Sequence, residues 1–183
     1  MTSGSLAGRL LLASTTLEDP NFMRTVVLIG MHSDDGALGL VLNRPSTSTV
    51  AAAVPDLEEM VDDEEPVFVG GPVNGSAIVM LAEFIDPEPA GLLVLGRIGL
   101  PGPDTSVEDL AAATARRRVY AGYAGWGEGQ LDAELERGDW ITQDALPDDV
   151  FCEDPDGLWS SALARKGGRY ALLARMPLDP SLN

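Results

Sequence analysis

Short strand-like segments outnumber helical ones in this chain, and that imbalance constrains the fold more than any other feature. The strand-like segments are rich in leucine or β-branched residues and are bounded by turn residues. They lie at 9–14, 25–32, 38–43, 66–70, 77–83, 91–98, 118–125 and 139–142. The sequence SDDGA at 33–37 predicts a hairpin turn, because Asp-Gly favours the backbone conformations of tight turns.

Helical patterns occur at four places that do not alternate regularly with the strands. They lie at 46–60, 106–115, 128–138 and 154–168. Asp154 and Pro155 are a typical helix start, whereas Pro55 breaks the first of these segments. The irregular order favours an α+β fold with a mixed sheet over a doubly wound parallel fold. With 183 residues, we expect 1–183 to form a single domain that folds without a metal or a disulfide.

The charge of the chain excludes several classes of partner. Asp and Glu number 29 against 12 Lys and Arg, so the net charge is -17 and the pI is about 4.1. Such a field repels nucleic-acid backbones and anionic lipid surfaces, and the cationic cluster available to oppose it is Arg116–Arg118. We therefore expect no direct binding to duplex DNA and no membrane association. The N-terminal apolar core is too short for a signal peptide, which predicts a cytoplasmic protein.

The chain has one cysteine and one histidine, which limits the catalytic sites it can build. Cys152 lies among acidic residues, which raise a thiol pKa and favour an inert cysteine. His32 ends a strand close to Asp34 and Asp35, so it is a candidate general base or pH sensor. The competing and favoured interpretation is a half-buried residue at a strand end with one backbone partner.

Acidic runs at 34–35, 62–65 and 148–149 raise the question of a Mg²⁺ or Ca²⁺ site. None has the spacing of an EF-hand loop, and runs of this kind are typical of solvated surfaces. We expect no metal and no cofactor.

The stretch GYAGWGEGQ at 122–130 resembles a phosphate-binding loop in its glycine content. Glu128–Gly129 occupy the places where a P-loop needs Lys and Ser/Thr, and Asp132 replaces the last glycine of the dinucleotide pattern. The stretch therefore predicts a structural corner between a strand and a helix, with Glu128 in the first helical turn. We expect Trp126 and Trp140 to pack at either end of that helix.

Two further short stretches are candidates for a ligand site. In LNRP, Arg44 is placed to clamp an anion, although an arginine that staples two loops is equally consistent. The GGP at 70–72 fits either a functional loop or a plain turn. If these stretches converge with GYAGW, the candidate ligand-binding residues are His32, Asn43, Arg44, Gly70, Gly71, Tyr123, Trp126 and Gln130.

Taken together, these stretches resemble the AlgH/YqgE family of bacterial proteins. The stretches that carry the resemblance are 8–14, 19–29, 36–45, 69–73, 120–140, 158–159 and PSLN at 180–183. Met31 stands where the family commonly has a Glu before the histidine, which disfavours an acid–histidine site shared with the family. The resemblance implies a compact α+β domain whose bent sheet closes into a partial barrel, with helices packed around it. The family has no established activity, and its members are often labelled transcriptional regulators.

Three functional hypotheses follow. The first is a non-enzymatic accessory or regulatory protein that acts through a protein partner or a small ligand. The second is an enzyme, or a protein that binds nucleotides or small anions, with its site near LNRP, GGPV and GYAGW. The third is a transcriptional regulator, which the charge opposes. A pocket lined by Asn43, Arg44 and Gln130 would favour the second hypothesis, whereas a flat surface would favour the first.

Overall fold

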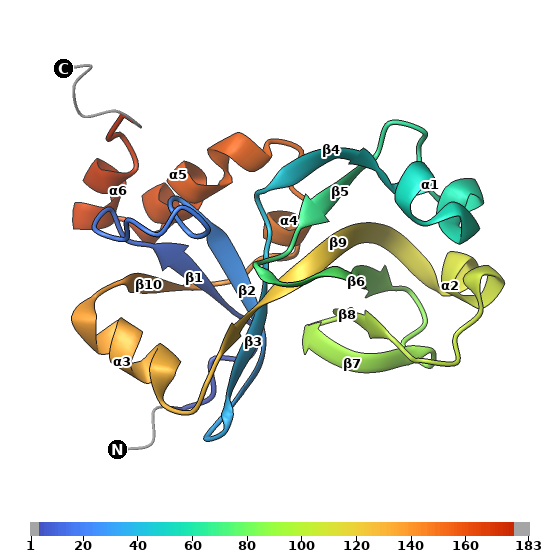
Figure 1. Ribbon diagram of the computed structural model, residues 1–183, viewed down its shortest axis with the longest axis horizontal. Coiled ribbons are helices and arrows are strands. Elements are labelled where there is room, and N and C mark those ends of the chain that lie inside the picture. Colours follow the sequence, from blue (N-terminus) through green and yellow to red (C-terminus); the bar gives the residue numbers. More distant parts are fainter. Residues whose placement is uncertain (1–3, 178–183) are drawn as a thin grey trace.

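The computed structural model describes residues 4–177 and shows one continuous sheet that curls into a half-barrel, with helices packed around it (Figure 1). The strands are β1 (Arg9–Ala13), β2 (Val26–Ser33), β3 (Gly36–Val41), β4 (Pro45–Thr49), β5 (Pro66–Val69), β6 (Val73–Phe84), β7 (Ala90–Leu95), β8 (Ile98–Pro101), β9 (Thr114–Trp126) and β10 (Trp140–Asp144). The α+β class predicted from the sequence is confirmed, and so is the bent sheet that the family resemblance implies.

The strand order places β9 at the centre of the sheet. The main path runs β10-β1-β2-β3-β9-β6-β8-β7, with every neighbouring pair antiparallel. β4 pairs with β5, and β5 pairs with β9 in parallel, so the sheet is mixed as expected. Because β9 spans 13 residues and pairs with β3, β5 and β6, its glycines and aromatic residues lie where the two halves of the sheet meet.

The helices are short and lie at the periphery of the sheet (Figure 1). They are α1 (Val50–Ala53), the 3-10 helix η1 (Pro55–Met60), α2 (Val107–Ala113), α3 (Gln130–Arg137), α4 (Pro147–Val150), α5 (Pro155–Lys166) and α6 (Arg169–Leu173). Asp154 caps α5 by accepting a hydrogen bond from the Gly157 N–H, as the sequence predicts. Within residues 4–177, no helix combines the length and the apolar character needed to cross a bilayer.

The β1 strand separates two hydrophobic cores. Leu10 and Leu12 pack with α5 on one face of the sheet, whereas Leu11 and Ala13 pack with α3, Trp126 and Trp140 on the other. Successive side chains of a strand point to opposite faces, so a strand that is buried on both sides needs a continuous apolar run. The run LLLA at 10–13 meets this requirement.

Several local predictions need correction. The segment 91–98 is two strands, β7 and β8, joined by a turn in which Gly96 has φ 57°. Residues 46–49 of the helical segment predicted at 46–60 belong to β4, and the helix predicted at 106–115 ends at Ala113, immediately before β9 begins at Thr114. Propensity does not reveal these boundaries, because pairing with a neighbouring strand overrides it. The α4 and α6 helices were not predicted from the sequence.

Candidate functional site

The GGP and GYAG stretches cross backbone to backbone, and this crossing explains their glycines. A Cβ atom on Gly70 would overlap the Gly122 carbonyl oxygen, and one on Gly71 would overlap the backbone of Tyr123. A Cβ on Gly122, whose φ is +72°, would lie 2.6 Å from the Gly71 oxygen. The chain can approach itself this closely only without side chains. Gly70 and Gly71 are therefore required by the fold.

The GYAGWGEGQ stretch is a strand-to-helix corner, as predicted, but its details differ. The α3 helix begins at Gln130, so Glu128 lies before the helix and not in its first turn. The two tryptophans do not lie at opposite ends of α3. Their rings contact each other with centroids 6.0 Å apart, because β9 and β10 bring Trp126 and Trp140 to the same side of the helix.

Glu134 of α3 holds the two tryptophans together. Its Oε2 accepts a hydrogen bond from each indole N–H, both at 2.8 Å. Its Oε1 accepts a bond of 2.9 Å from the side-chain amide of Gln130, whose own oxygen accepts from the Gly127 N–H. Trp126 and Gln130 thus belong to a hydrogen-bond network that closes the corner.

Asn43 and Arg44 both attach LNRP to the chain that precedes β2. Asn43 is 8% exposed, accepts a hydrogen bond from the Val26 N–H and donates one to the Arg24 carbonyl, both at 2.9 Å. Arg44 donates to the Met23 carbonyl at 2.6 Å, which is the loop staple that the sequence left as one alternative. The polar side-chain atoms of Asn43 are therefore used in hydrogen bonds within the fold. The hydrogen bond from Arg44 to Met23 uses only part of its guanidinium group.

His32 has the backbone partner expected of a strand-end residue. Its Nδ1 accepts a hydrogen bond of 3.1 Å from the Leu6 N–H, and its side chain is half-buried. The favoured interpretation of His32 is confirmed. Asp34 and Asp35 form the two-residue turn of the β2–β3 hairpin and are exposed.

The structure brings two of the predicted residues, Arg44 and Gly71, to one small cavity of about 290 Å³. The lining residues are Pro20, Asn21, Val41, Arg44, Pro45, Val69, Gly71 and Pro72. Asn43 and Gln130 do not line this cavity, so it is not the three-residue pocket that would have favoured an enzyme.

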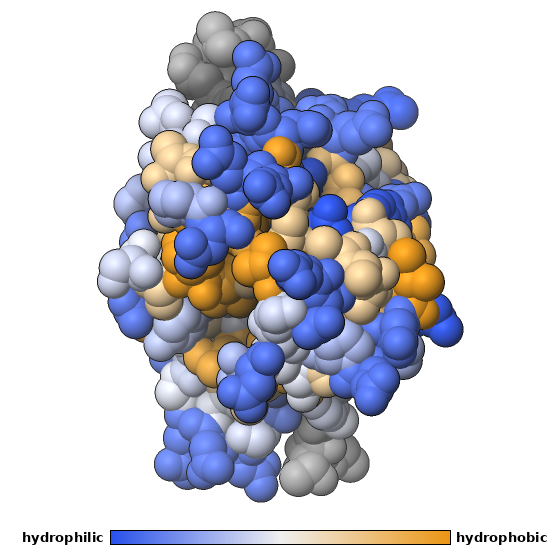
Figure 2. All heavy atoms as spheres, turned by 90° about the vertical axis from the view of Figure 1, so that its right-hand side faces the viewer, coloured by the Kyte–Doolittle hydropathy of each residue, from blue (hydrophilic) through white to orange (hydrophobic). Residues whose placement is uncertain are grey.

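The structure also shows an apolar groove that the sequence did not predict. It has a volume of about 170 Å³ and lies between the β2–β3 hairpin and the β7–β8 hairpin. Its lining residues are Leu28, Gly30, Met31, Leu38, Gly39, Leu40, Val79, Leu81, Leu92, Val94, Leu100 and Tyr123. On the face that carries α1 and α2, at the right of Figure 1, hydrophobic patches also lie between hydrophilic side chains (Figure 2).

Tyr123 is the one predicted residue that lines this groove. The side chains of Leu38, Val73 and Tyr123 come together over Gly125, each within 4 Å of the position of a Cβ built there.

Most of the charged clusters form ion pairs and hydrogen bonds within the fold. Arg116 pairs with Glu83 at 2.7 Å and with Asp148 at 2.8 Å, which raises its pKa. Asp149 is 4% exposed and receives two hydrogen bonds from Arg165, so the expectation that run 148–149 is merely solvated was wrong. In the described part of the chain, no group of three or more His, Cys, Asp or Glu side chains is arranged to hold a metal ion.

Cys152 has a raised pKa, but for a reason that differs from the predicted one. The largest cause is burial, and the nearby Arg118 acts in the opposite direction. The Arg118 guanidinium lies over the Phe68 ring and donates to the carbonyls of Val150 and Cys152. The expected direction is confirmed, and the thiol is disfavoured as a nucleophile.

Comparison with known proteins places this geometry in a family. A sequence model of the AlgH-like family matches residues 10–171. The chain belongs to the AlgH-like family. This AlgH-like protein is 44% identical to a UPF0301 protein of Thermobifida fusca over 98% of this chain and 96% of the relative. It is 43% identical to a UPF0301 protein of Mycobacterium tuberculosis, over 97% of this chain and 90% of the relative.

Two solved structures share the fold of this AlgH-like protein. The solution structure of AlgH from Pseudomonas aeruginosa has a TM-score of 0.71 and 30% identity, and 98% of each chain is covered. A crystal structure of a protein from Corynebacterium diphtheriae has a TM-score of 0.85 and 25% identity, covering 93% of this chain and 92% of that one. Of the stretches that suggested the family, PSLN lies outside the described residues.

Proposed function

We propose that this AlgH-like protein is a cytoplasmic, non-enzymatic accessory or regulatory protein that acts by binding a protein partner. The observation that carries the proposal is the apolar groove between the β2–β3 and β7–β8 hairpins. On its walls Met31, Leu38 and Leu92 are 54%, 42% and 38% exposed. Grouped apolar side chains that remain in water are typical of surfaces that another molecule covers.

The size and chemistry of the groove favour a protein partner over a metabolite. Its volume of about 170 Å³ is below the range of about 300–1,000 Å³ that is usual for small-molecule sites. It suits one large apolar side chain, the kind of anchor that dominates protein interfaces. Apart from Tyr123 and Met31, the lining side chains are aliphatic or absent, so they supply no general base and no metal ligand.

The polar residues of the predicted site also support a non-enzymatic role, because their side chains are engaged within the fold. Asn43, Trp126 and Gln130 direct their polar side-chain atoms to hydrogen bonds within the fold. A catalytic group must be free to exchange a proton or a bond with its substrate.

Differential capture tests the proposal. The wild-type protein and the Leu38→Glu variant are immobilised side by side in lysate of the bacterium that encodes them, and retained proteins are identified by mass spectrometry. Leu172→Glu serves as the control, because Leu172 is 69% exposed on α6 and receives the same change of charge. We expect a partner that binds the wild type and the control but not Leu38→Glu, and whose purified form reproduces this pattern. Identical binding to all three proteins would exclude the groove as the site.

A second candidate function is the binding of a small anion at the Arg44 cavity. The ion pairs found among residues 4–177 do not include Arg44, although the chain is strongly acidic. An arginine without a carboxylate, in a cavity of about 290 Å³, has donors to offer to a carboxylate or phosphate group.

Thermal denaturation in increasing inorganic phosphate tests this second candidate. A saturable rise in melting temperature that is absent in Arg44→Gln would support it. A rise that is linear in both proteins would reflect the general effect of phosphate on protein surfaces and would count against it.

The transcriptional label of the family fits a regulatory role that runs through a protein. Arg116 is paired with two carboxylates, and Arg117 and Arg118 bond to backbone carbonyls. The cationic cluster is therefore poorly suited to contact phosphates.

A further inference from the structure

The β7 strand has an open edge that lacks the usual protection. Within residues 4–177 it pairs with β8 alone, and its sequence AGLLVL contains no charged residue and no proline. Natural proteins protect an open edge with lysine, proline or a covering segment, because its free N–H and C=O groups can pair with another strand.

The open part of the edge is short and well defined. A Cβ on Gly8 would lie 2.7 Å from the Val94 carbonyl oxygen, so the segment before β1 covers the end of β7 there. Gly91, Leu92 and Leu93 remain exposed. The register of β7 with β8 is irregular on either side of Leu92 and Leu93, but these two residues pair consecutively with Leu100 and Gly99.

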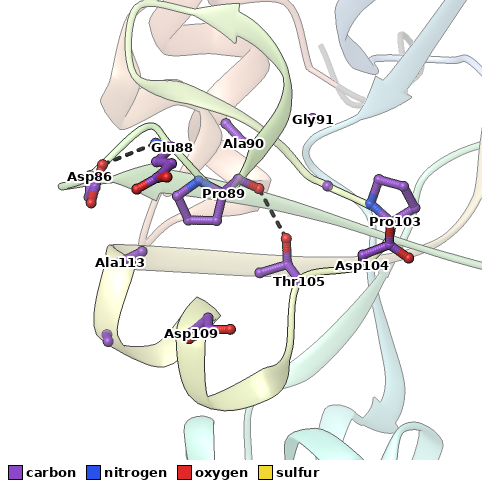
Figure 3. Close-up of a pocket in the computed structure, with 12 residues that line it drawn as sticks. Asp86, Glu88, Pro89, Ala90, Gly91, Pro103, Asp104, Thr105, Asp109 and Ala113 are labelled. Atoms are coloured by element: carbon purple, nitrogen blue, oxygen red, sulfur yellow. Dashed lines mark hydrogen bonds between the residues drawn. The ribbon is translucent and has the colours of Figure 1, made fainter.

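Two depressions of different chemistry meet at this edge. Leu92 and Val94 line the apolar groove, whereas Ala90 and Gly91 line an open depression of about 690 Å³ (Figure 3). The charged residues of that depression are all acidic, namely Asp86, Glu88, Asp104 and Asp109.

The positions of these carboxylates create a negative field that nothing in the depression neutralises. Asp86 follows the end of β6, Asp104 follows β8 and Asp109 belongs to α2, so they face the depression from three segments (Figure 3). Asp109 accepts a hydrogen bond from Ser106, and Asp86 accepts one from the Glu88 N–H. No arginine or lysine lies among its lining residues.

We propose that β7 is a docking strand for an extended segment of a partner protein that carries a basic residue close to an apolar anchor. The segment pairs its backbone with Gly91–Leu93, places the apolar side chain in the groove and directs the Arg or Lys to the acidic depression. Strand addition of this kind takes its affinity from backbone hydrogen bonds and its specificity from side-chain pockets. Because neighbouring residues of β7, Gly91 and Leu92, line the depression and the groove, the two side chains lie within about three residues of each other in an extended segment.

This inference rests on the proposed function, since it specifies the partner of the same groove. The probe is a fluorescein-labelled octapeptide of sequence RLRVRLRV, and its binding is followed by fluorescence anisotropy. One comparison peptide carries Glu in place of each Arg, and a second carries N-methyl groups on alternate backbone nitrogens along one edge of the strand. The anisotropy series is run at low and at physiological ionic strength, because screening weakens the charged contacts.

Two pairs of protein variants locate the site. Leu92→Lys introduces a positive charge into the groove at the open edge, and Leu172→Lys makes the same change on α6. The double variant Glu88→Gln with Asp104→Asn removes two charges from the depression. Its control, the double variant Glu58→Gln with Glu59→Gln, removes two exposed charges from η1. The folded state of each variant is checked by circular dichroism and thermal denaturation.

We expect Leu92→Lys to weaken peptide binding by at least about tenfold and the depression variant by about three- to tenfold at low salt. Both controls should stay within about twofold of the wild type, and the Glu peptide and the N-methylated peptide should bind poorly. Equal losses in variants and controls would overturn the proposal, because they would indicate non-specific attraction to an acidic protein. Full binding of the N-methylated peptide would overturn strand pairing. Dimers that form in the wild type and disappear in Leu92→Lys would show that the occupant is a second copy of the chain.

The outcome also separates this inference from the proposed function. If Leu38→Glu loses a native partner that Leu92→Lys retains, the proposed function stands and the docking strand is wrong. If the peptide binds at β7 as expected but no native partner depends on Leu38 or Leu92, the docking strand stands and the proposed function fails.

Discussion

Replacing Glu134 with leucine tests whether the corner after β9 is held by one carboxylate. Its Oε2 is the acceptor for the indole N–H groups of both Trp126 and Trp140, which are 6% and 4% exposed. Glu and Leu have similar helix propensities, so the change should not weaken α3 itself. The dominant effect is the loss of an acceptor for two buried donors.

The expected cost follows from those two donors. A buried donor left without a partner costs about 1–3 kcal/mol, so two give about 2–6 kcal/mol. Because Glu134 is only half-buried, water can replace part of the lost bonding, and the lower end of about 2 kcal/mol is expected. For a chain of this size, that corresponds to a fall in melting temperature of about 4–8 °C.

Urea denaturation followed by tryptophan fluorescence measures the change in the free energy of unfolding. Glu136→Leu is the matched control, because Glu136 lies on the same helix but is exposed. Glu134→Gln keeps side-chain acceptors and should lose less than half as much as Glu134→Leu. A Glu134→Leu value within about 0.5 kcal/mol of the Glu136→Leu control, the usual spread of surface substitutions, would refute the reasoning.

Five further outcomes are expected. Trp126→Ala should cost about 3–5 kcal/mol of unfolding free energy in the same urea assay. Mg-ATP or Mg-GTP should leave the wild-type melting temperature unchanged, since the P-loop lysine and hydroxyl are missing. A saturable rise in melting temperature would make the corner a nucleotide site. In an anisotropy titration at physiological salt, a genomic DNA fragment pool should show no measurable binding, and nanomolar sequence-selective binding would contradict this. The melting temperature near pH 7 should rise between low and moderate NaCl, because salt screens the repulsion of a net charge of -17; a flat or falling trend would indicate local pairing. Cys152 should react with a thiol reagent more slowly than a free cysteine near pH 8, and a reaction as fast as that of free cysteine would show that burial is incomplete. Because burial raises the pKa of the folded thiol, the contribution of Cys152 to stability is present below the ordinary thiol pKa and is lost as pH rises through the raised value.

Local features of the fold could be predicted where a short stretch of sequence is enough to specify them. Asp154 caps α5 through the N–H three residues later, and the missing lysine excludes a P-loop wherever the loop lies. The meeting of Trp126 with Trp140 could not be predicted in this way. Their contact depends on how far apart β9 and β10 lie in the sheet, which is a matter of strand order.

The candidate site shows the same division. The sequence singled out Arg44 and Gly71, which do share a cavity, but it also singled out Asn43 and Gln130, whose polar atoms form hydrogen bonds within the fold. Whether a polar side chain faces a ligand or a backbone group is decided by which donors and acceptors the fold leaves unpaired.

By itself the sequence determined the α+β class, the family and the acidic field. These properties depend on composition, on local periodicity and on residues whose chemistry is the same in any surroundings. Only the tertiary structure decided that 91–98 is a hairpin with an open edge, and that β7 curls round to form an apolar groove with β2 and β3. Curvature and strand order arise from pairing between distant segments, so the surfaces that they leave exposed cannot be read from any one segment.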